Sequence, residues 1–363
     1  MRKDSPLFCA AFQFKKNFAS TLGPKALKDF EKSFYGAFIQ ESDFQNIAKL
    51  GFNCIRLPFH HGLVETKPYQ YSEEGLRYLD QALQWAKKYK LYVILDLHAA
   101  VGCQNHDWHS DSLGKAELWQ NKTFQDRTFA LWEFLADRYK DHATVAGYDL
   151  LNEAVIDNTT KLNDFYQELI RRIRLVDKNH IFFVEGNKWA TDIECLDHFK
   201  DDNFALSIHF YSPLEFTFNF VPLLSYPLRC RKPVWDKAML GRMVDSYGKI
   251  AKRRQLPIFV GEFGVNDRDN RFGEGEWLSD ALEAFKQHGF HWTYWTYKAV
   301  KNTIFPDGLL SYYPNDPWVN RHGPQLGWDT YAKLWGGRKK EIIESWKTKN
   351  YTPSTKIIKV LQR

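Results

Sequence analysis

The sequence predicts an α/β fold: a (β/α)8 TIM barrel that forms a single domain over residues 1–363, with long loops after its strands. Short apolar runs alternate with amphipathic segments along most of the chain. The runs are almost continuously apolar, as parallel strands are when helices cover both faces of the sheet. Chain length and the number of runs favour a closed barrel over a doubly wound sheet, and no G-x-G-x-x-G motif follows an early strand.

Helices are predicted from capping signals and from apolar residues at helical spacing. In residues 42–51, Ser42 and Gln45 match a capping box, and Gly51 is expected to end the helix. Residues 73–90 carry an amphipathic pattern. Further helices are predicted over 124–139, 161–176, 239–254 and 276–288.

Strand-like runs fall between these helices. They cover residues 53–58, 91–98, 146–151, 181–185, 204–209, 257–261 and 290–296. Seven strands separated by crossovers imply a parallel sheet. We expect the remaining strand near residues 7–14, where the pattern is weak. The loops after residues 98 and 209 and the segment 299–335 are long and aromatic, and such loops build the site of a barrel.

The distribution of charge argues against a nucleic-acid partner. The net charge is +6, and residues 338–363 alone contain eight basic and two acidic residues, so the rest of the chain is neutral. A basic tail beside a neutral body is typical of a solvated end. The 13 tryptophans are more than a core needs, and they favour a groove lined with flat rings.

The cysteines and the absence of long apolar runs bear on compartment. The five cysteines are scattered and form no C-x-x-C pair, which argues against a disulfide framework or a zinc ribbon. No signal peptide is visible, and no run approaches the ~18 apolar residues of a membrane span. We therefore expect a cytoplasmic monomer without a membrane partner, or a secreted protein if a leader has been removed.

Two glutamates stand where apolar runs end. Glu153 closes Ala146–Glu153, and Glu262 follows Pro257–Gly261. An apolar strand that ends in a carboxylate is costly unless the charge is useful there. Because the strand ends of a barrel meet at one rim, the two acids could flank one bond, which is the chemistry of glycoside hydrolysis. The alternative is two structural acids, each neutralised by an arginine or a helix.

Other polar and aromatic residues share this rim. They are Arg56, His98, Asn152, His209, Tyr211 and Trp295. In a sugar-cleaving site, one glutamate should be a general acid that its surroundings keep protonated. The other should be ionised, stabilised by Arg and Tyr, and able to attack carbon.

Six strings at these positions carry a family resemblance. They are Ile55-Arg56-Leu57-Pro58, Asp96-Leu97-His98, Leu151-Asn152-Glu153, His209-Phe210-Tyr211, Gly261-Glu262-Phe263-Gly264 and Trp292-Thr293-Tyr294-Trp295. Over about residues 42–300, their order resembles the motif series of glycoside hydrolase family 5, the cellulase-type family of clan A. One departure is that residues 8–18 lack the Gly-x-Asn-Leu-Gly type of first strand usual in that family.

The resemblance implies a retaining double displacement that needs no cofactor. Glu153 would be the acid/base and Glu262 the nucleophile, with their carboxyls about 5–5.5 Å apart. The supporting residues implied are Arg56 and Tyr211 at Glu262, Asn152 at the sugar 2-hydroxyl, His98 and His209 in the −1 subsite, and Trp295 as its sugar platform.

The segment His106–Asp111 contains residue types that suit zinc, but no H-E-x-x-H or C-x-x-C motif accompanies it. We therefore predict no metal. We expect a substrate loop in which Trp108 stacks on sugar and His109, Asp107 or Asp111 bonds hydroxyls.

The resemblance favours an endo-acting hydrolase of β-glucan or β-gluco-oligosaccharides. An exo-acting β-glucosidase, an exo-β-1,3-glucanase and a mannosidase or mannanase remain open. So does a different class of protein, a sugar-binding barrel without catalysis. The segment 305–318, with Trp328 after it, could wall off the groove and so favour exo action.

Overall fold

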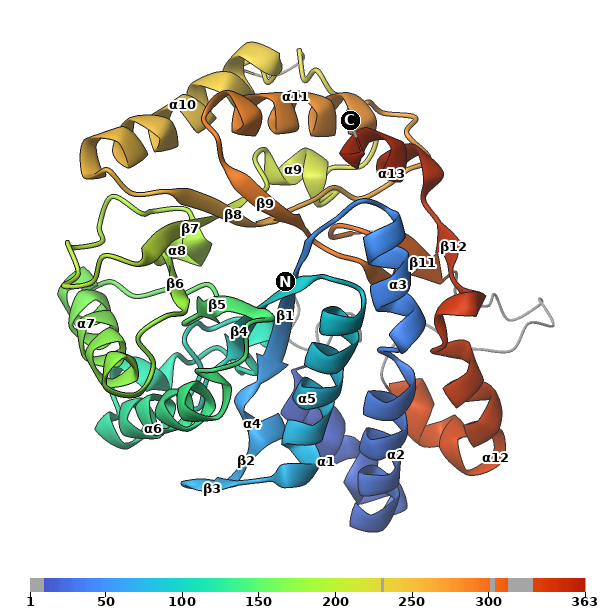
Figure 1. Cartoon of the computed structure of the whole chain (residues 1–363). Helices are drawn as coiled ribbons and strands as arrows, with labels where there is room; N and C mark the ends of the chain where they lie inside the picture. The colour runs from blue at the N-terminus through green and yellow to red at the C-terminus, as the bar shows by residue number, and fades with distance from the viewer. Residues whose placement is uncertain (1–9, 230–231, 301–303, 313–328, 363) are drawn as a thin grey trace.

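The computed structural model describes residues 10–229, 232–300, 304–312 and 329–362. Its centre is a nearly closed barrel of parallel strands surrounded by helices, which confirms the predicted fold class (Figure 1). The sheet order is β1-β4-β5-β6-β7-β8-β9. These strands are β1 (Cys54–His60), β4 (Tyr92–Ala99), β5 (Val145–Asp149), β6 (Ile181–Glu185), β7 (Phe204–Phe210), β8 (Ile258–Phe263) and β9 (His291–Tyr294).

The barrel has a seam between β9 and β1. Among the described residues no hydrogen-bonded ladder joins these two strands, and a cavity of about 130 Å³ lies between them. The strand predicted over residues 7–14 is wrong in its second half, because Ala11 begins helix α1 (Ala11–Leu22). Residues 7–9 lie outside the described part of the chain.

The predicted crossover helices are confirmed to within a few residues. They are α3 (Glu41–Lys49), α5 (Glu73–Lys88), α6 (Lys122–Tyr139), α7 (Thr159–Val176), α10 (Lys237–Arg254) and α11 (Glu274–Gln287). The predicted cap of α3 is wrong: the N–H of Gln40 donates to Asp43 Oδ2 at 2.7 Å, so the capping box lies two residues before Ser42. Ser72 caps α5 by accepting from the N–H of Gly75.

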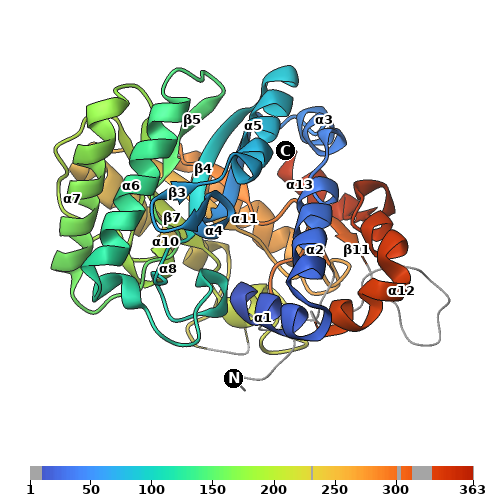
Figure 2. The same ribbon diagram turned by 90° about the horizontal axis from the view of Figure 1, so that it is seen from below.

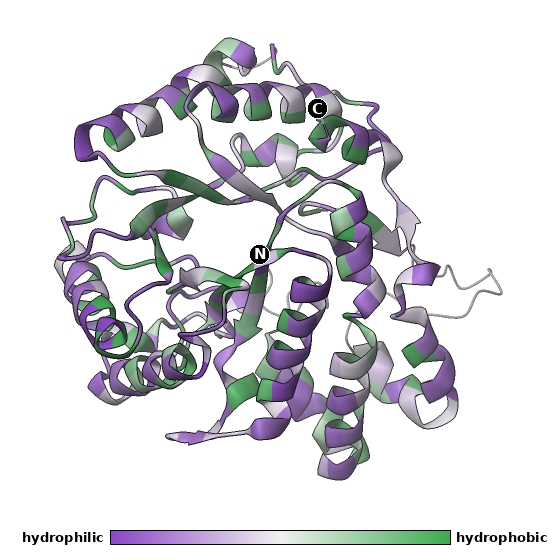
Figure 3. Cartoon of the chain, viewed as in Figure 1, coloured by the Kyte–Doolittle hydropathy of each residue, from purple (hydrophilic) through white to green (hydrophobic). Residues whose placement is uncertain are grey.

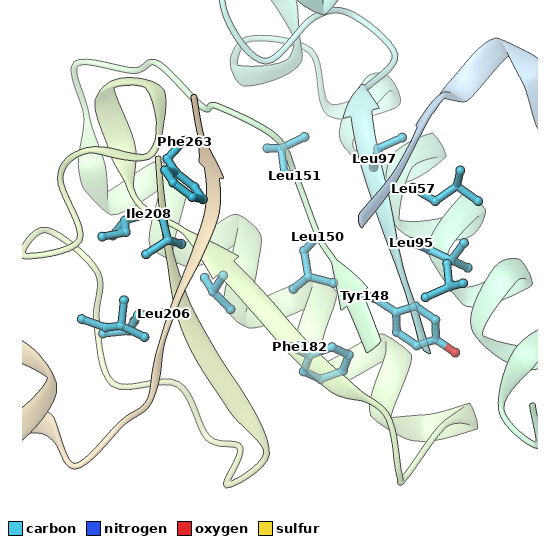
Figure 4. Close-up of a cluster of buried hydrophobic side chains, with 14 of the residues drawn as sticks. Leu57, Leu95, Leu97, Tyr148, Leu150, Leu151, Phe182, Leu206, Ile208 and Phe263 are labelled. Carbon is cyan, nitrogen blue, oxygen red and sulfur yellow. The ribbon is translucent and has the colours of Figure 1, made fainter. Parts of the chain in front are cut away.

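The main core lies between the strands and the helices. Leu57, Leu95, Tyr148 and Phe182 stand beside one another on neighbouring strands and are almost fully buried (Figure 4). Burying each such side chain stabilises the fold by roughly 1.5–3 kcal/mol relative to exposure. Colouring by hydropathy shows the same division, with green gathered on strands such as β7 and β8 and purple spread over the helices (Figure 3).

The interior of the barrel changes character along the strands. Near their starts, Ile94, Phe183, Ala205 and Phe259 form a small apolar cluster. Side chains on one face of a strand recur every second residue. Two residues beyond members or neighbours of this cluster, the same face carries polar groups: Arg56 after Cys54, Asp96 after Ile94, Glu185 after Phe183 and Ser207 after Ala205. The polar site therefore occupies the carboxyl-terminal half of the barrel.

A second core lies outside the barrel and joins both ends of the described chain. It contains Phe14 and Phe18 of α1, Phe30 of α2 (Pro24–Ala37), and Trp335 of α12 (Asp329–Ser345) with Trp346 just after it. Helix α1 lies across one end of the barrel (Figure 2). There the N–H of Phe12 donates to Asp111 Oδ1 at 2.7 Å.

The expectation of a solvated basic tail is wrong. Helix α12 and helix α13 (Thr355–Leu361) bury Ile342, Ile357 and Leu361. Basic residues of the tail pair on the surface instead, as Lys339 does with Asp29. Amphipathic spacing in the tail, rather than its net charge, decides its structure.

Short elements complete the described chain. They are α4 (His61–Val64), β2 (Glu65–Lys67), β3 (Gln70–Tyr71), α8 (Asn187–Ala190), α9 (Leu214–Thr217), β10 (Lys298–Val300), β11 (Leu310–Tyr312), β12 (Thr352–Pro353) and three 3-10 turns at 108–110, 117–119 and 348–350. No described helix combines the length and apolar character of a membrane span. Cys54, Cys103 and Cys195 are free, while Cys9 and Cys230 lie outside the described residues.

Candidate active site

Glu262 is a buried residue of β8 whose two carboxylate oxygens are both bound. Arg56 Nη1 donates to Oε1 at 2.8 Å, and the hydroxyl of Tyr211 donates to Oε2 at 2.8 Å. Burial and the charge of Glu262 raise the pKa of Tyr211 well above its usual value, so the phenol remains a donor. The guanidinium and the phenol therefore hold both oxygens of this carboxylate in place by hydrogen bonds to a charged group.

Glu153 lies four residues beyond the end of β5 and contacts two imidazoles. Its Oε1 is 2.7 Å from His209 Nδ1, and its Oε2 is 2.9 Å from His109 Nε2. Burial alone would raise the pKa of Glu153, but the hydrogen bonds from these histidines outweigh burial and hold the pKa well below its usual range. Burial lowers the pKa of each imidazole, yet the surrounding carboxylates raise both above the usual value.

The surroundings of Glu153 lower its pKa, which contradicts the expectation that they keep its carboxyl protonated. The physical reason is that the hydrogen bonds stabilise the carboxylate more than burial destabilises it. The three groups titrate as one unit.

The two glutamates approach each other closely. One carboxylate oxygen of each, together with a ring nitrogen of His209, lies within 4.8 Å of the others. Inverting glycosidases need ~6.5–9.5 Å between the carboxyls, whereas retaining enzymes hold them at ~5–5.5 Å. These three residues could also reach a common metal ion, but both oxygens of Glu262 already accept hydrogen bonds from Arg56 and Tyr211.

Asn152 precedes Glu153 and is fully buried. Its Oδ1 accepts from Arg56 Nη2 at 2.8 Å, while its Nδ2 has no hydrogen-bond partner among the described residues. A buried donor without a partner is costly unless a ligand satisfies it. Asn152 therefore offers an amide N–H to a bound molecule.

His98 and Trp295 form the aromatic part of the site. Their rings are parallel, with centroids 5.2 Å apart and an interplanar angle of 1°. His98 Nδ1 is also 2.9 Å from Asp96 Oδ2, which fixes the imidazole. The stacked pair presents flat rings next to the carboxylates.

Comparison with known proteins identifies the family. The family model described as "Cellulase (glycosyl hydrolase family 5)" matches residues 15–301. The chain belongs to glycoside hydrolase family 5. Its membership of this family makes it a glycosyl hydrolase, and its (β/α) barrel matches the fold of solved members.

Several relatives of this family-5 chain are known. It is 33% identical to a β-xylosidase of Phanerodontia chrysosporium over 80% of this chain, but it spans only 62% of that protein. It is 27% identical to endoglucanase C of Acetivibrio thermocellus, over 76% of this chain and 89% of that protein. A crystal structure of Thermotoga maritima Cel5A in complex with mannotriose matches its fold with a TM-score of 0.65, 20% identity, and coverage of 89% and 90%.

Three buried acids of this family-5 site escaped the sequence analysis. All contact Arg56: Asp149 Oδ2 at 2.7 Å, Glu185 Oε1 at 2.9 Å and Asp96 Oδ1 at 3.2 Å. With Glu262, four carboxylates surround one guanidinium. Burial, followed by the charge of Glu185, raises the pKa of Asp149 despite Arg56. Two-residue periodicity back from the rim would have found Asp96.

The loop after β4 differs from the expected substrate loop, because several of its residues contact other side chains of the protein. His109 was expected to bond sugar hydroxyls, but it contacts Glu153. Trp108 is 39% exposed, as a stacking residue should be. Asp107 instead accepts from the indole N–H of Trp189 at 2.7 Å, and Asp111 lies 3.0 Å from His60. These two acids therefore shape the loop, and Trp189 was missed because its exposure depends on a left-handed turn.

Gly261 explains how His209 fits beneath the carboxylates. A Cβ at this position would lie 2.9 Å from Ser207 Oγ and 3.3 Å from His209 Nε2. Glycine thus lets strand β8 approach the imidazole closely. Ten of the twelve residues that the sequence analysis placed in the site belong to one connected set of contacts, and the other two are the loop acids Asp107 and Asp111.

Proposed function

We propose that this protein is a retaining β-glycosidase that hydrolyses β-glucans or β-gluco-oligosaccharides, with Glu262 as nucleophile and Glu153 as acid/base. The observation that carries the proposal is the 4.8 Å limit on the separation of their nearest oxygens. No water fits between a sugar carbon and a nucleophile at that spacing, so Glu262 itself attacks.

In the first step, Glu262 attacks the anomeric carbon while the glycosidic C–O bond breaks. Glu153 receives a proton from the neighbouring histidines and passes it to the departing oxygen, which leaves Glu153 as a carboxylate. The products are a free alcohol and a covalent glycosyl-enzyme. The N–H of Asn152 is available for the sugar 2-hydroxyl, where a hydrogen bond strengthens in the transition state.

In the second step, Glu153 takes a proton from water as the water oxygen attacks the same carbon. The bond to Glu262 breaks, and the sugar leaves with its original configuration. Arg56 and Tyr211 stabilise Glu262 as it becomes a carboxylate again.

Replacing the nucleophile tests the proposal. Glu262→Ala should reduce hydrolysis of β-gluco-oligosaccharides to background, and added azide should restore bond cleavage with an α-glycosyl azide as product. Glu283→Ala, on the exposed side of α11, is the control and should keep wild-type rates. Wild-type turnover of a β-glycan by Glu262→Ala would exclude this role.

An exo-acting enzyme for short glycosides is the second candidate, because aromatic rings bridge one side of the site. Trp108 contacts Phe305 at 5.9 Å between centroids, Phe305 contacts Phe218 at 5.3 Å, and Phe218 packs on Tyr211 at 4.9 Å. The row runs from the loop beside Glu153 to the side of Glu262. The name of the β-xylosidase relative also supports this candidate.

A product profile separates the two candidates. Mixed oligomers from barley β-glucan, laminarin, carboxymethylcellulose or glucomannan would indicate endo action and identify the linkage. Monosaccharide release from cello-oligosaccharides, xylo-oligosaccharides or aryl glycosides alone would indicate exo action behind the aromatic row.

A further inference from the structure

Glu185, the last residue of β6, contacts both halves of the site from below. Its Oε1 accepts from Arg56 Nη2 at 2.9 Å, and Arg56 in turn binds Glu262. Its Oε2 accepts from the backbone N–H of Glu153 at 2.5 Å. Glu185 is fully buried and both its oxygens accept hydrogen bonds from these neighbours, so it acts on the chemistry through the residues around it.

The backbone of Glu153 needs this support. Its φ is 49°, in the left-handed region that side chains other than glycine and asparagine rarely adopt. Only from this conformation does its carboxyl meet His109 and His209 in the structure. The carboxylate of Glu185 binds the N–H at the strained residue, and the side-chain amide of Asn105 donates to its carbonyl at 2.8 Å.

Glu185 also faces the imidazole that contacts the acid/base. His209 Nε2 lies 3.2 Å from Glu185 Oε1, an electrostatic contact between the imidazole and the carboxylate. A negative charge on this side of the ring favours a proton on Nε2, which leaves Nδ1 to exchange a proton with Glu153. The hydrogen bond to the backbone of Glu153 and the charge beside His209 therefore both act on Glu153.

We propose that Glu185 is a positioning residue for the acid/base. Its carboxylate fixes the left-handed backbone of Glu153 and links that backbone to Arg56, which in turn binds the nucleophile Glu262. This inference rests on the roles proposed above for Glu153 and Glu262. Asp149 offers a matched comparison, because it is equally buried and bonds Arg56 at 2.7 Å but has no contact with Glu153 among the described residues.

The test uses leaving groups that differ in their need for a proton. Phenyl β-glucoside needs a general acid, whereas 2,4-dinitrophenyl β-glucoside does not. Glu185→Gln has a single carbonyl oxygen and cannot accept from both Arg56 and Glu153. It should lower kcat/KM for the phenyl glucoside by ~10²-fold and for the dinitrophenyl glucoside by less than ~10-fold, because general acid catalysis contributes ~10²–10⁴-fold.

Asp149→Asn should lower both rates by one common factor, since it acts only through Arg56. A Glu185→Gln variant whose two rates also fall by a common factor would overturn the inference. So would a full ~10²-fold loss when Glu185→Gln is added to Glu153→Ala, where no carboxyl remains to be positioned.

Folding is monitored by circular dichroism and by thermal unfolding. If Glu185→Gln fails to fold, Glu185→Asp keeps the charge beside Arg56 but is too short to span both partners, and it should change the ratio of the two rates in the same direction. Failure of both variants to fold while Asp149→Asn folds would overturn the inference in favour of a purely structural role. Wild-type turnover by Glu262→Ala would instead overturn the proposed function itself.

Discussion

His109 Nε2 lies 2.9 Å from Oε2 of Glu153, although the two residues belong to loops after different strands. His209 Nδ1 contacts the other oxygen of the same carboxylate at 2.7 Å. The acid/base therefore stands between two imidazoles and does not occupy an apolar pocket. Its proton affinity is set by hydrogen bonds more than by burial.

Replacing His109 should shift the pH dependence of the enzyme. The hydrogen bond from His109 lowers the pKa of Glu153, so His109→Ala should raise that pKa. A higher pKa lets the protonated acid persist to higher pH, and the basic limb of the kcat/KM profile should move upward. The measurement is kcat/KM of an aryl β-glycoside from pH 4 to 9.

His106→Ala is the matched control for that experiment. His106 lies in the same loop but packs on Trp189, with ring centroids 5.9 Å apart. Its profile should coincide with that of the wild type. A basic limb that moves downward in His109→Ala would mean that His109, rather than Glu153, holds the proton that the leaving group needs.

Removing the acid/base should discriminate between substrates. Glu153→Ala should lower kcat/KM for natural oligosaccharides by ~10²–10⁴-fold. Glycosides of dinitrophenol need no proton and should lose far less in the glycosylation step, which a stopped-flow burst measures. Equal losses on both kinds of substrate would contradict the acid role of Glu153.

The parts of the site that lie at strand ends could be predicted from sequence. Glu262 and His209 follow apolar runs directly, so the barrel rim alone brings them together. The inward positions just below the rim could not be recognised in the same way. Asp96 and Glu185 belong to runs that look like core, and only the guanidinium of Arg56, from another strand, makes their burial tolerable.

The role of His109 and the structure of the chain ends could not be predicted from the sequence, for a different reason. The contact of His109 with Glu153 depends on loop geometry, which has no periodic signal. The strand expected near residues 7–14 rested on a weak pattern, and residues 11–14 instead form the start of helix α1. Its partners Trp335 and Trp346 lie more than 300 residues away, and tertiary packing decides the outcome.

Lys298 should be important for stability, because it joins the two chain ends to the barrel. Its ammonium donates to the carbonyl of Phe38 and to Thr348 Oγ1, the latter at 2.9 Å, and lies 3.6 Å from Asp43. Lys298→Ala would leave the carboxylate of Asp43 without its cation and the carbonyl of Phe38 without this donor, and it should lower the free energy of unfolding by ~3–5 kcal/mol. Urea denaturation measures this. Lys252 is exposed, so Lys252→Ala should change the free energy of unfolding by less than ~0.5 kcal/mol. Equal effects of the two substitutions would contradict the role of Lys298 in joining the chain ends to the barrel.

His61 should make the fold sensitive to acid. Burial, followed by the neighbouring His60, lowers the pKa of His61 to about 3. The unfolded chain binds this proton near pH 6.5 and the folded chain does not, so stability falls as the pH drops below about 6.5.

Between pH 7 and 5 the loss attributable to His61 is at most about 2 kcal/mol. His61→Gln does not titrate and can still donate to the carbonyl of Ala99, which lies 3.2 Å from His61 Nδ1. Urea denaturation of this variant at the two pH values should therefore show a smaller difference than the wild type, by up to that amount. Exposed His198→Gln should keep the wild-type difference. If His61→Gln keeps it as well, His61 is not the source of the acid sensitivity.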